Sequence, residues 1–353
     1  MKSPSKSVLF GGLFDRKDEA GPVAVRFEMK IIRKADTVMI KKDDNVTIAH
    51  DLESAACIIC HSAGLAYVNA LRDDDNYWAA RCNTCGHIQV TPLPTVEEDE
   101  KYYQNNEIYR KLIQKSAMDD TALMYKMEPW ADAQVKIVTE LVPRDKSLLE
   151  MGGGYGFFVE KIRAAGYACT GIELSDEKCL MAKQRAGIDL INANILDESF
   201  CMAEKFDVVC LFGVLEHIAD PVGLLKQVRK FLVDGGKLIL TVPNVDQWLN
   251  QYSGGYYNHH FFRGHLHYFS KDTLTNVIQL AKYFNIRIFG KQHYSVENAI
   301  HWMRNNTPVL SNLQFEVPEA LGAINQVFKK QLEEQLASDI LVGVGTNICC
   351  MAE

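Results

Sequence analysis

The sequence predicts an α/β fold, in which a mostly parallel sheet of seven strands follows a small cysteine-rich domain. Residues 147–294 alternate short apolar runs with helical patterns, as strands and crossover helices do in parallel sheets. Alternate glycines directly follow the first of these strands, and two Cys-x-x-Cys pairs precede the whole region. The alternation predicts the sheet, the glycines predict a ligand-binding turn, and the cysteines predict a separate metal-binding module.

The glycine turn joins the first strand to the first helix of the alternating region. Glu150 ends the strand, and Gly152, Gly154 and Gly156 follow at alternate positions. Glycine permits backbone angles that are closed to other residues and lets a ligand lie directly on the backbone. A dinucleotide-binding turn would carry its third glycine at the position of Phe157. The spacing therefore predicts a nucleotide-like ligand without the pyrophosphate of a dinucleotide.

The form Glu-x-Gly-x-Gly-x-Gly resembles the first motif of class I S-adenosylmethionine-dependent methyltransferases. The resemblance implies a Rossmann-like methyltransferase sheet, with the methionine part of the cofactor over the three glycines and its amino end near Glu150. It also assigns the ribose hydroxyls to Glu173, which ends the second strand 17 residues after Gly156. The carboxylate of Glu173 can accept both hydroxyls in a bidentate manner.

Three further residues complete the cofactor set that the resemblance implies. Asn194 ends the third strand where the family commonly has an aspartate, and its amide oxygen can still accept a hydrogen bond from the adenine amino group. Ile195 would lie beside the adenine ring, and a role in packing fits it equally well. Phe212, at the end of the fourth strand, belongs to the same edge of the predicted sheet.

The fourth strand delivers Glu216 and His217 to the cofactor side of the sheet. The run from Gly213 to Ile218 resembles the Leu-Glu-His segment of methyltransferases that act on quinones, small metabolites and sugars. His217 is the best candidate for a general base, because imidazole titrates near neutral pH and can take a proton from a hydroxyl or an acidic carbon. The alternative is a histidine that lines the pocket and orients Glu216.

A loop after the fifth strand, over residues 256–268, is predicted to form a lid that closes over the acceptor. It carries the four substrate-binding candidates Tyr257, Arg263, His265 and His267. The planar guanidinium group of Arg263 suits an acceptor carboxylate or phosphate, and a surface salt bridge is the plainer alternative. A metal ion held by the histidines of this loop is disfavoured, because no carboxylate or cysteine joins them and Arg263 would lie near the cation.

Two Cys-x-x-Cys knuckles, separated by 21 residues, are formed by Cys57, Cys60, Cys82 and Cys85. Each knuckle places two thiolates on one side of a tight turn, as a tetrahedral zinc ion requires. The pattern predicts a structural four-cysteine zinc ribbon whose closed shell leaves no position for catalysis. A redox dithiol is disfavoured, because there are two pairs and no thioredoxin-like context surrounds them.

The chain divides into four predicted parts. They are a short β-rich extension over residues 1–49, the zinc ribbon over 50–95, a helical linker above the cofactor pocket over 96–143, and the methyltransferase domain over 144–353. The extension is interpreted as structural or dimerising. The linker carries tyrosines that pack or contact the ligand: Tyr102, Tyr103 and Tyr109. A helical insertion over 295–339 covers the acceptor site or makes a dimer contact, and residues 340–350 form an antiparallel strand at the edge of the sheet.

Composition bounds the partners of the protein. The 353 residues carry a net charge of -7 and are 47% hydrophobic, so a substantial core is expected and no global positive field attracts nucleic acid or an anionic membrane. A small or weakly charged acceptor fits better. No apolar run approaches the roughly 18 residues of a membrane span, and the basic start lacks the apolar stretch of a signal peptide. A cytoplasmic protein is expected, with a homodimer left open.

The leading hypothesis is transfer of a methyl group from S-adenosylmethionine to an oxygen or carbon atom of a small-molecule acceptor. The order of ribbon and methyltransferase is similar to that of deoxysugar C-methyltransferases, but their long C-terminal domain is missing and Val214 has no hydroxyl to assist a base. Two alternatives remain. An RNA-directed enzyme would use the ribbon to hold RNA, which its acidic residues 73–75 disfavour. A non-catalytic subunit or scaffold would bind the cofactor alone.

Overall fold

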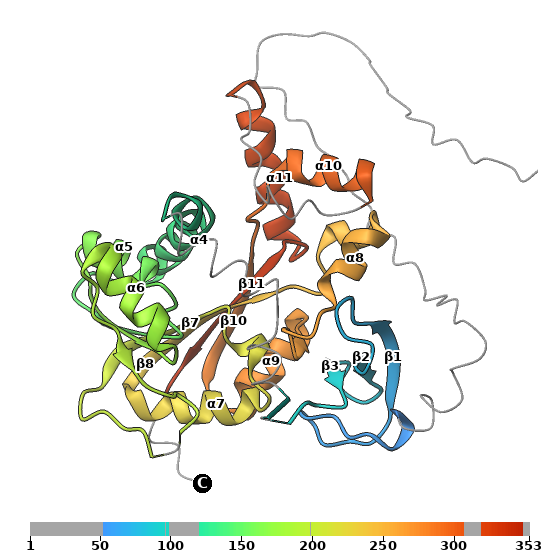
Figure 1. The fold of residues 1–353 in the computed structure, drawn as a ribbon, viewed down its shortest axis with the longest axis horizontal. Helices are drawn as coiled ribbons and strands as arrows, with labels where there is room; N and C mark the ends of the chain where they lie inside the picture. The colour runs from blue at the N-terminus through green and yellow to red at the C-terminus, as the bar shows by residue number, and fades with distance from the viewer. Residues whose placement is uncertain (1–51, 96, 99–119, 198, 307–318, 349–353) are drawn as a thin grey trace, which may run out of the picture. The chain divides into compact units, whose positions relative to one another are not determined.

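The computed structural model describes residues 52–95, 97–98, 120–197, 199–306 and 319–348. The predicted extension over residues 1–49 and the linker tyrosines Tyr102, Tyr103 and Tyr109 lie outside these residues, so both remain predictions. Among the described residues, no helix is both long enough and apolar enough to cross a membrane. The strands of the described part form two sheets, and helices cover both faces of the larger one (Figure 1).

The larger sheet contains the seven strands that the sequence predicts. In chain order they are β4 Ser147–Met151, β5 Ala168–Glu173, β6 Ile191–Asn192, β7 Phe206–Phe212, β8 Leu232–Pro243, β10 Phe284–Lys291 and β11 Ile340–Thr346. Their order across the sheet is β10-β11-β8-β7-β4-β5-β6, and every neighbouring pair from β8 to β6 is parallel. The predicted α/β fold with a mostly parallel sheet is confirmed. Ligands bind such sheets at the edge where the parallel strands end.

The antiparallel strand lies inside the sheet and not at its edge. β11 is antiparallel to both of its neighbours, β8 and β10, and β10 forms the edge. In β11, Leu341 and Val342 are fully buried, whereas Asn285 and Arg287 of β10 point outward. The predicted edge position of residues 340–350 is therefore wrong, because this strand has a neighbour on each side.

Two groups of helices cover the faces of the larger sheet. On one face lie α4 (Asp120–Leu141), α5 (Phe157–Ala164) and α6 (Asp176–Ala186), and on the other lie α7 (Pro221–Val228) and α9 (Lys271–Leu280) (Figure 1). Successive side chains of a strand point to opposite faces, so Leu148 packs in the core under the first group and Leu149 in the core under the second. The two cores pack on opposite faces of β4 and β7, whose ends carry the candidate site.

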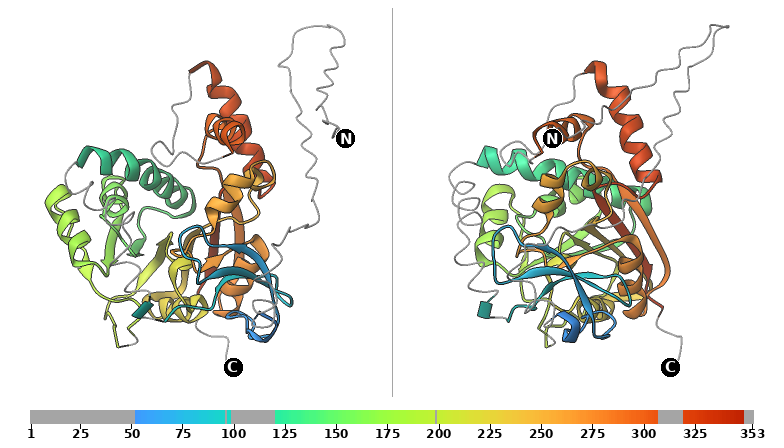
Figure 2. Two further views of the ribbon diagram at one scale, coloured as in Figure 1. Left: turned by 45° about the vertical axis from the view of Figure 1, so that its right-hand side comes forward. Right: turned by 90° about the vertical axis from the view of Figure 1, so that its right-hand side faces the viewer.

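The smaller sheet joins the ribbon to the predicted lid. Its ribbon strands are β1 (Leu65–Ala70), β2 (Trp78–Cys82) and β3 (Ile88–Thr91), and all of its pairs are antiparallel. A fourth strand, β9 (His267–Tyr268), comes from the loop after β8 and pairs with β3. Figure 2 shows the blue ribbon strands against this part of the chain. The ribbon and the lid therefore share one sheet, which the sequence did not predict.

Most of the remaining described helices lie in two segments, the loop after β8 and the insertion over residues 295–339. α8 (Gly254–His260) follows β8, while α10 (Val296–Asn305) and α11 (Gly322–Glu334) lie within the insertion over residues 295–339. Four short 3-10 helices are also described: η1 Leu215–His217, η2 Arg229–Phe231, η3 Trp248–Gln251 and η4 Glu319–Leu321. Tyr256 of α8 stacks on Trp302 of α10, with ring centroids 4.7 Å apart. This contact packs the two segments against each other.

Candidate active site

The glycine turn lies at the carboxyl end of β4 and is held against β5. The N–H of Gly152 donates to the carbonyl oxygen of Ile172 at 2.9 Å. Gly152, Gly154 and Gly156 have φ values of 83°, 54° and 77°, which glycine adopts far more readily than other residues. A Cβ atom at Gly152 would meet Val214 at 2.6 Å, whereas one at Gly154 would meet nothing within 4 Å. Gly154 therefore presents bare backbone to open space, as a turn that carries a ligand does.

Glu150 is a buried carboxyl group beside this turn. The residue is 4% exposed, and its Oε2 has no hydrogen-bond partner among the described residues. Burial, assisted by the charge of Glu173, raises the pKa of Glu150 to about 8. A buried acceptor without a partner costs about 1–3 kcal/mol, so its presence indicates a group that arrives with a ligand. The cationic amino end of S-adenosylmethionine fits this requirement.

Glu173 holds the turn from the end of β5. Its Oε2 accepts a hydrogen bond from the N–H of Gly154 at 2.8 Å, and its Oε1 accepts one from the N–H of Ser175 at 2.9 Å. The ammonium group of Lys178 lies 3.8 Å from Oε1. Each carboxylate oxygen has a second lone pair, so these contacts leave acceptors for ribose hydroxyls. The contact with Gly154 links the turn to the carboxylate, which spacing in the sequence did not reveal.

The other predicted cofactor residues lie along the same edge of the sheet. Asn194 follows β6, is exposed, and accepts a hydrogen bond from the N–H of Leu196 at 2.9 Å through Oδ1. Ile195 is half-buried and packs against the core. Phe212 ends β7 and contacts Phe158 edge to face, with ring centroids 4.9 Å apart. Because β4 lies between β7 and β5, the turn has Phe212 on one side and Asn194 on the other.

A brace that the sequence did not predict holds the back of the turn. The guanidinium group of Arg185 lies 3.7 Å from the ring centroid of Phe157 and pairs with Glu160 at 2.6 Å. It also donates to the carbonyl oxygen of Tyr155 at 3.2 Å. Ala131 of α4 belongs to the same small cluster as Phe157. Residues of α4 and α6 thus fix the start of α5. They are distant in the sequence, so no local pattern predicts this contact.

Glu216 and His217 lie in η1, directly after β7. Glu216 is 3% exposed, and its Oε2 has no hydrogen-bond partner among the described residues. Its Oε1 lies 4.0 Å from Nε2 of His217. His265 joins them from the lid, with its ring centroid 4.9 Å from that of His217 in an edge-to-face contact. The structure therefore brings together both predicted catalytic residues and one predicted substrate-binding residue.

The contacts of His217 fix where its proton lies. Nδ1 is 2.5 Å from the carbonyl oxygen of Gly264, which can only accept, so Nδ1 carries the proton. Burial lowers the pKa of His217, so the ring is neutral near pH 7 and Nε2 keeps its lone pair. Burial also raises the pKa of Glu216 to about 8, which keeps most of this carboxyl group protonated at neutral pH. The two side chains present one neutral base and one neutral acid.

The expectation that no carboxylate joins the histidines of the lid is wrong. Donor atoms of Glu216, His217 and His265 all lie within 4.8 Å of one another, close enough to hold a metal ion. Arg263, which gave the second reason against a metal, contacts Tyr77 instead, with its guanidinium carbon 4.6 Å from the ring centroid. A carboxyl group beside two imidazoles has both acid–base and metal-binding capacity.

His267 and Arg263 serve the contact between the ribbon and the lid. His267 is 1% exposed, its Nε2 donates to the carbonyl oxygen of Ile218 at 2.9 Å, and its Nδ1 lies 3.0 Å from Nε2 of His87. Arg263 is also 1% exposed and lies over the ring of Tyr77. Both side chains are buried at this contact, so Arg263 does not lie on the surface, where the alternative for it was expected. The substrate-binding roles of His267 and Arg263 stay predictions.

Hydrogen bonds connect the ribbon to Glu216 through the lid. The N–H of Val90 in β3 donates to the carbonyl oxygen of Leu266 at 2.9 Å, and the N–H of Leu266 donates to that of Glu216 at 2.7 Å. An apolar cluster continues this contact, with Tyr257 packed against it: Leu71, Tyr77, Ala79, Ile88, Val90, Phe261, Leu266 and Tyr268. The ribbon therefore positions the segment that carries His265.

The four predicted metal ligands lie together in the ribbon. The sulfur atoms of Cys57 and Cys85 are 3.6 Å apart, those of Cys60 and Cys82 are 3.5 Å apart, and all four lie within 4.8 Å of one another. Thiolates in a tetrahedron around zinc, each about 2.3 Å from the ion, are roughly 3.8 Å apart. The N–H groups of Thr84 and Cys85 lie 3.4 and 3.5 Å from the sulfur of Cys82, where they stabilise a thiolate. The set therefore fits zinc.

Residues 126–286 match the family model of a methyltransferase domain. This segment is a methyltransferase domain. The glycine turn, Glu173 and the Glu216–His217 pair all lie within it, whereas the ribbon precedes it. The methyltransferase domain also includes β9, so the ribbon contributes three strands to a sheet that the domain completes.

Relatives of known name match part of the chain. This chain is 33% identical over 108 residues to the ubiquinone biosynthesis O-methyltransferase of Haemophilus ducreyi. The aligned segment covers 28% of this chain and 46% of that protein. The protein of the same name from Coxiella burnetii is 27% identical over 112 residues, covering 31% of this chain and 48% of that protein. The chain thus spans less than half the length of these relatives. A solved SAM-dependent methyltransferase from Thermotoga maritima, described as a possible histamine N-methyltransferase, aligns with a TM-score of 0.42 and 17% identity over 71% of this chain and 95% of that one.

Proposed function

We propose that the chain transfers a methyl group from S-adenosylmethionine to an oxygen or carbon atom of a small molecule. The observation that carries the proposal is the buried carboxyl group of Glu150, whose Oε2 has no hydrogen-bond partner among the described residues, beside the bare backbone of Gly154. A nucleoside with a cationic amino end fits both features, and Glu173 offers acceptor lone pairs to its ribose. The methyltransferase domain supports the reaction, and the names of the relatives favour oxygen as the accepting atom.

His217 is proposed as the general base of this reaction. Its Nε2 takes the proton of an acceptor hydroxyl or acidic carbon while the acceptor atom bonds to the methyl carbon and the bond from that carbon to sulfur breaks. The sulfonium group, when bound, supplies the electrophilic methyl carbon and leaves as a neutral thioether. Val214 lies against Gly152, so the segment that carries His217 adjoins the turn that would hold the cofactor. In-line alignment of the two substrates supplies much of the rate.

Zinc is proposed as the ion of the four-cysteine set. Four thiolates close its shell, so the ion stabilises the ribbon and takes no part in methyl transfer. The effect on the active site is indirect, because β3 holds the lid through the pairing with β9 and through Val90.

Binding and label transfer test the proposed function. In calorimetry, the zinc-loaded chain should bind S-adenosylmethionine and S-adenosylhomocysteine, and labelled S-adenosylmethionine with fractionated cell metabolites should give a labelled small molecule by mass spectrometry. Absence of binding to either nucleoside would refute the cofactor assignment. Binding without transfer to any fraction would favour the non-catalytic subunit, and label in an RNA fraction would favour the RNA-directed enzyme.

Replacing Glu150 with glutamine is expected to weaken binding of S-adenosylmethionine by about 10–100-fold, because a neutral amide cannot form an ion pair with the amino end. It should also flatten the pH dependence of stability in the cofactor-free protein. The pKa of Glu150 is about 8 in the folded chain and near its ordinary value of 4.5 when unfolded, so wild-type stability falls as pH rises from about 4.5 to about 8 and levels off above 8. Calorimetry and thermal unfolding across this pH range measure both effects.

A matched control for this variant is Glu177→Gln on α6. Glu177 is exposed, so its replacement should change neither the affinity for the cofactor nor the pH dependence of unfolding. A Glu150→Gln protein that binds S-adenosylmethionine as tightly as the wild type would contradict the cofactor assignment. If Glu150→Gln were destabilised equally at every pH, the cause would be a packing defect and not the lost titration of Glu150.

A further inference from the structure

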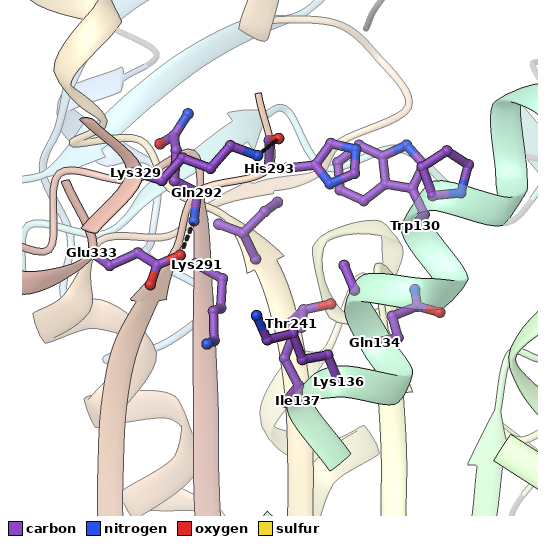
Figure 3. Close-up of a pocket in the computed structure, with 13 residues that line it drawn as sticks. Trp130, Gln134, Lys136, Ile137, Thr241, Lys291, Gln292, His293, Lys329 and Glu333 are labelled. Atoms are coloured by element: carbon purple, nitrogen blue, oxygen red, sulfur yellow. Dashed lines mark hydrogen bonds between the residues drawn. The ribbon is translucent and has the colours of Figure 1, made fainter. Parts of the chain in front are cut away.

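A cavity of about 360 Å³ opens between α4, β8, β10 and α11. Figure 3 shows the side chains around it, which include Trp130, Lys136, Thr241, Lys291, His293 and Lys329. The volume lies in the range of sites that take small molecules, roughly 300–1,000 Å³. None of these residues belongs to the site built from the glycine turn and His217.

The cavity lies next to the proposed cofactor site. Thr241 lines it, and Thr241 pairs with Phe212 in the register of β8 with β7. Paired residues of neighbouring strands point to the same face of the sheet. The cavity therefore begins at β8, one strand away from Phe212 of the proposed cofactor site. α4 spans both places, because Ala131 packs with Phe157 and Ile137 lines the cavity. A molecule in the cavity would lie beside β7, whose end delivers His217.

Three lysines from three elements line the cavity, and one of them, Lys291, pairs with Glu140 at 3.2 Å, which leaves Lys136 and Lys329 as the candidates to hold an anion. Lys136 comes from α4, Lys291 from β10 and Lys329 from α11, and Glu333 is the single carboxylate of the lining (Figure 3). Glu333 already accepts a hydrogen bond from the N–H of Gln292 at 2.9 Å. The whole chain carries a net charge of -7, so this concentration of lysines is a local exception. Such a lining attracts an anion.

The surroundings of Lys329 support the same conclusion. Its Nζ donates to the carbonyl oxygen of His293 at 2.7 Å, which holds the ammonium group at the cavity wall (Figure 3). Burial lowers the pKa of Lys329, Asp339 and Glu333 raise it, and Lys136 lowers it again. Lys136 and Lys329 line the same cavity, where their like charges disfavour each other. An anion between two ammonium groups would remove this repulsion.

One wall of the cavity is aromatic. The rings of Trp130 and His293 stack with centroids 3.6 Å apart and planes inclined by 17° (Figure 3). Burial lowers the pKa of His293 to about 3, so this ring is neutral and contributes apolar surface. Ile137 and Ile340 extend the apolar lining. A wall of this kind suits a flat ring, which gains contact area at little cost in conformational freedom.

We propose that this cavity is the acceptor site, and that the acceptor is a planar ring bearing a carboxylate or a phosphate. The inference rests on the proposed function, which places the cofactor one strand away. The ring lies along Trp130 and His293, Lys136 and Lys329 hold the anionic group, and the group to be methylated faces β7.

Two matched probes test this acceptor site by binding alone. Protocatechuate and catechol share a dihydroxylated ring and differ by one carboxylate, and both are titrated into the full, zinc-loaded chain saturated with S-adenosylhomocysteine. Protocatechuate should bind about 10–100-fold more tightly, because only it forms charge-assisted hydrogen bonds with the lysines. A third titration with phenyl phosphate decides whether a phosphate or a carboxylate is the preferred anion.

Lysine variants assign the preference to the cavity. Lys136→Gln and Lys329→Gln should each reduce the preference for protocatechuate over catechol by at least about fivefold. Lys330→Gln is the matched control, because Lys330 is the next residue of α11, is exposed and pairs with Glu334 at 3.8 Å. It should leave the preference unchanged. Equal affinity of the wild type for the two aromatic probes, binding of neither probe, or an unchanged preference in both cavity variants would overturn the inference.

The binding of S-adenosylhomocysteine is measured first in the same sample. Its absence would refute the proposed function. Its presence without a preference for the anionic probe would refute only the acceptor site, so the two failures are distinguishable.

Discussion

A His217→Ala variant is expected to lose about 10²–10⁴-fold in kcat, while its affinity for S-adenosylmethionine changes by less than about threefold. Nε2 of His217 carries the lone pair that accepts the proton. Nδ1 donates to the carbonyl oxygen of Gly264, and burial lowers the pKa of the ring, so the imidazole is neutral. Its removal leaves the acceptor proton without a base, whereas the glycine turn, Glu150 and Glu173 keep their contacts. Steady-state kinetics and calorimetry on one preparation measure the two quantities.

The pH profile gives a second readout of the same base. Wild-type kcat should fall as pH drops through the pKa of His217, which lies below 6.5, because a protonated imidazole cannot accept a proton. This acidic limb should disappear in His217→Ala. His265→Ala leaves the base in place and should keep the acidic limb. An unchanged kcat in His217→Ala would remove this residue from the mechanism, and a retained limb would assign the titration to another group.

Removal of the metal from the ribbon is expected to have the largest effect on stability. A Cys82→Ser protein should lose its zinc, because Cys82 is one of four buried or half-buried ligands. Structural zinc contributes about 10–16 kcal/mol of apparent binding free energy in zinc-finger peptides, so its loss should unfold β1, β2 and β3. The lid then loses its partner strand, and kcat should fall by at least about tenfold. Elemental analysis, thermal unfolding and kinetics measure these effects.

The matched control for the ribbon is Cys201→Ser. Cys201 is exposed and lies outside the four-cysteine set, so this variant should keep its zinc, its unfolding temperature and its kcat. Full zinc content in Cys82→Ser would contradict the ligand assignment. A zinc-free ribbon with undiminished kcat would show that the lid does not depend on it.

Local sequence patterns were sufficient to predict the parallel strands and not their order. A strand buried on both faces reads as an apolar run wherever it occurs, and β7 is of this kind. The place of β11 depends on contacts with distant residues. A Cβ at Gly343 would lie 2.8 Å from Ile278, and one at Gly345 would lie 2.9 Å from Tyr283, so these glycines allow close packing inside the fold. The sequence pattern of this strand alone does not reveal that it has a neighbour on each side.

The candidate site divides in the same way. The glycine turn, Glu150 and the Glu216–His217 pair could be predicted because each lies within a few residues of a strand end. The contact of His267 with the ribbon could not be predicted from the sequence, because its partner His87 is 180 residues away in the chain. A histidine in a polar loop resembles a substrate ligand until its buried partner is known. The lysines of the acceptor cavity likewise come from three separate elements and share no local pattern.

The pairing of β3 with β9 also affects how the chain is made. The ribbon strands leave the ribosome before the methyltransferase domain, yet the last strand of their sheet follows about 180 residues later. Contacts between such distant segments form late in folding. During that interval the outer side of β3 carries unpaired backbone groups, which attract strands of neighbouring nascent chains. Binding of zinc by the ribbon does not cover this side, so β3 stays an unpaired edge until residues 267–268 have been made and pair with it.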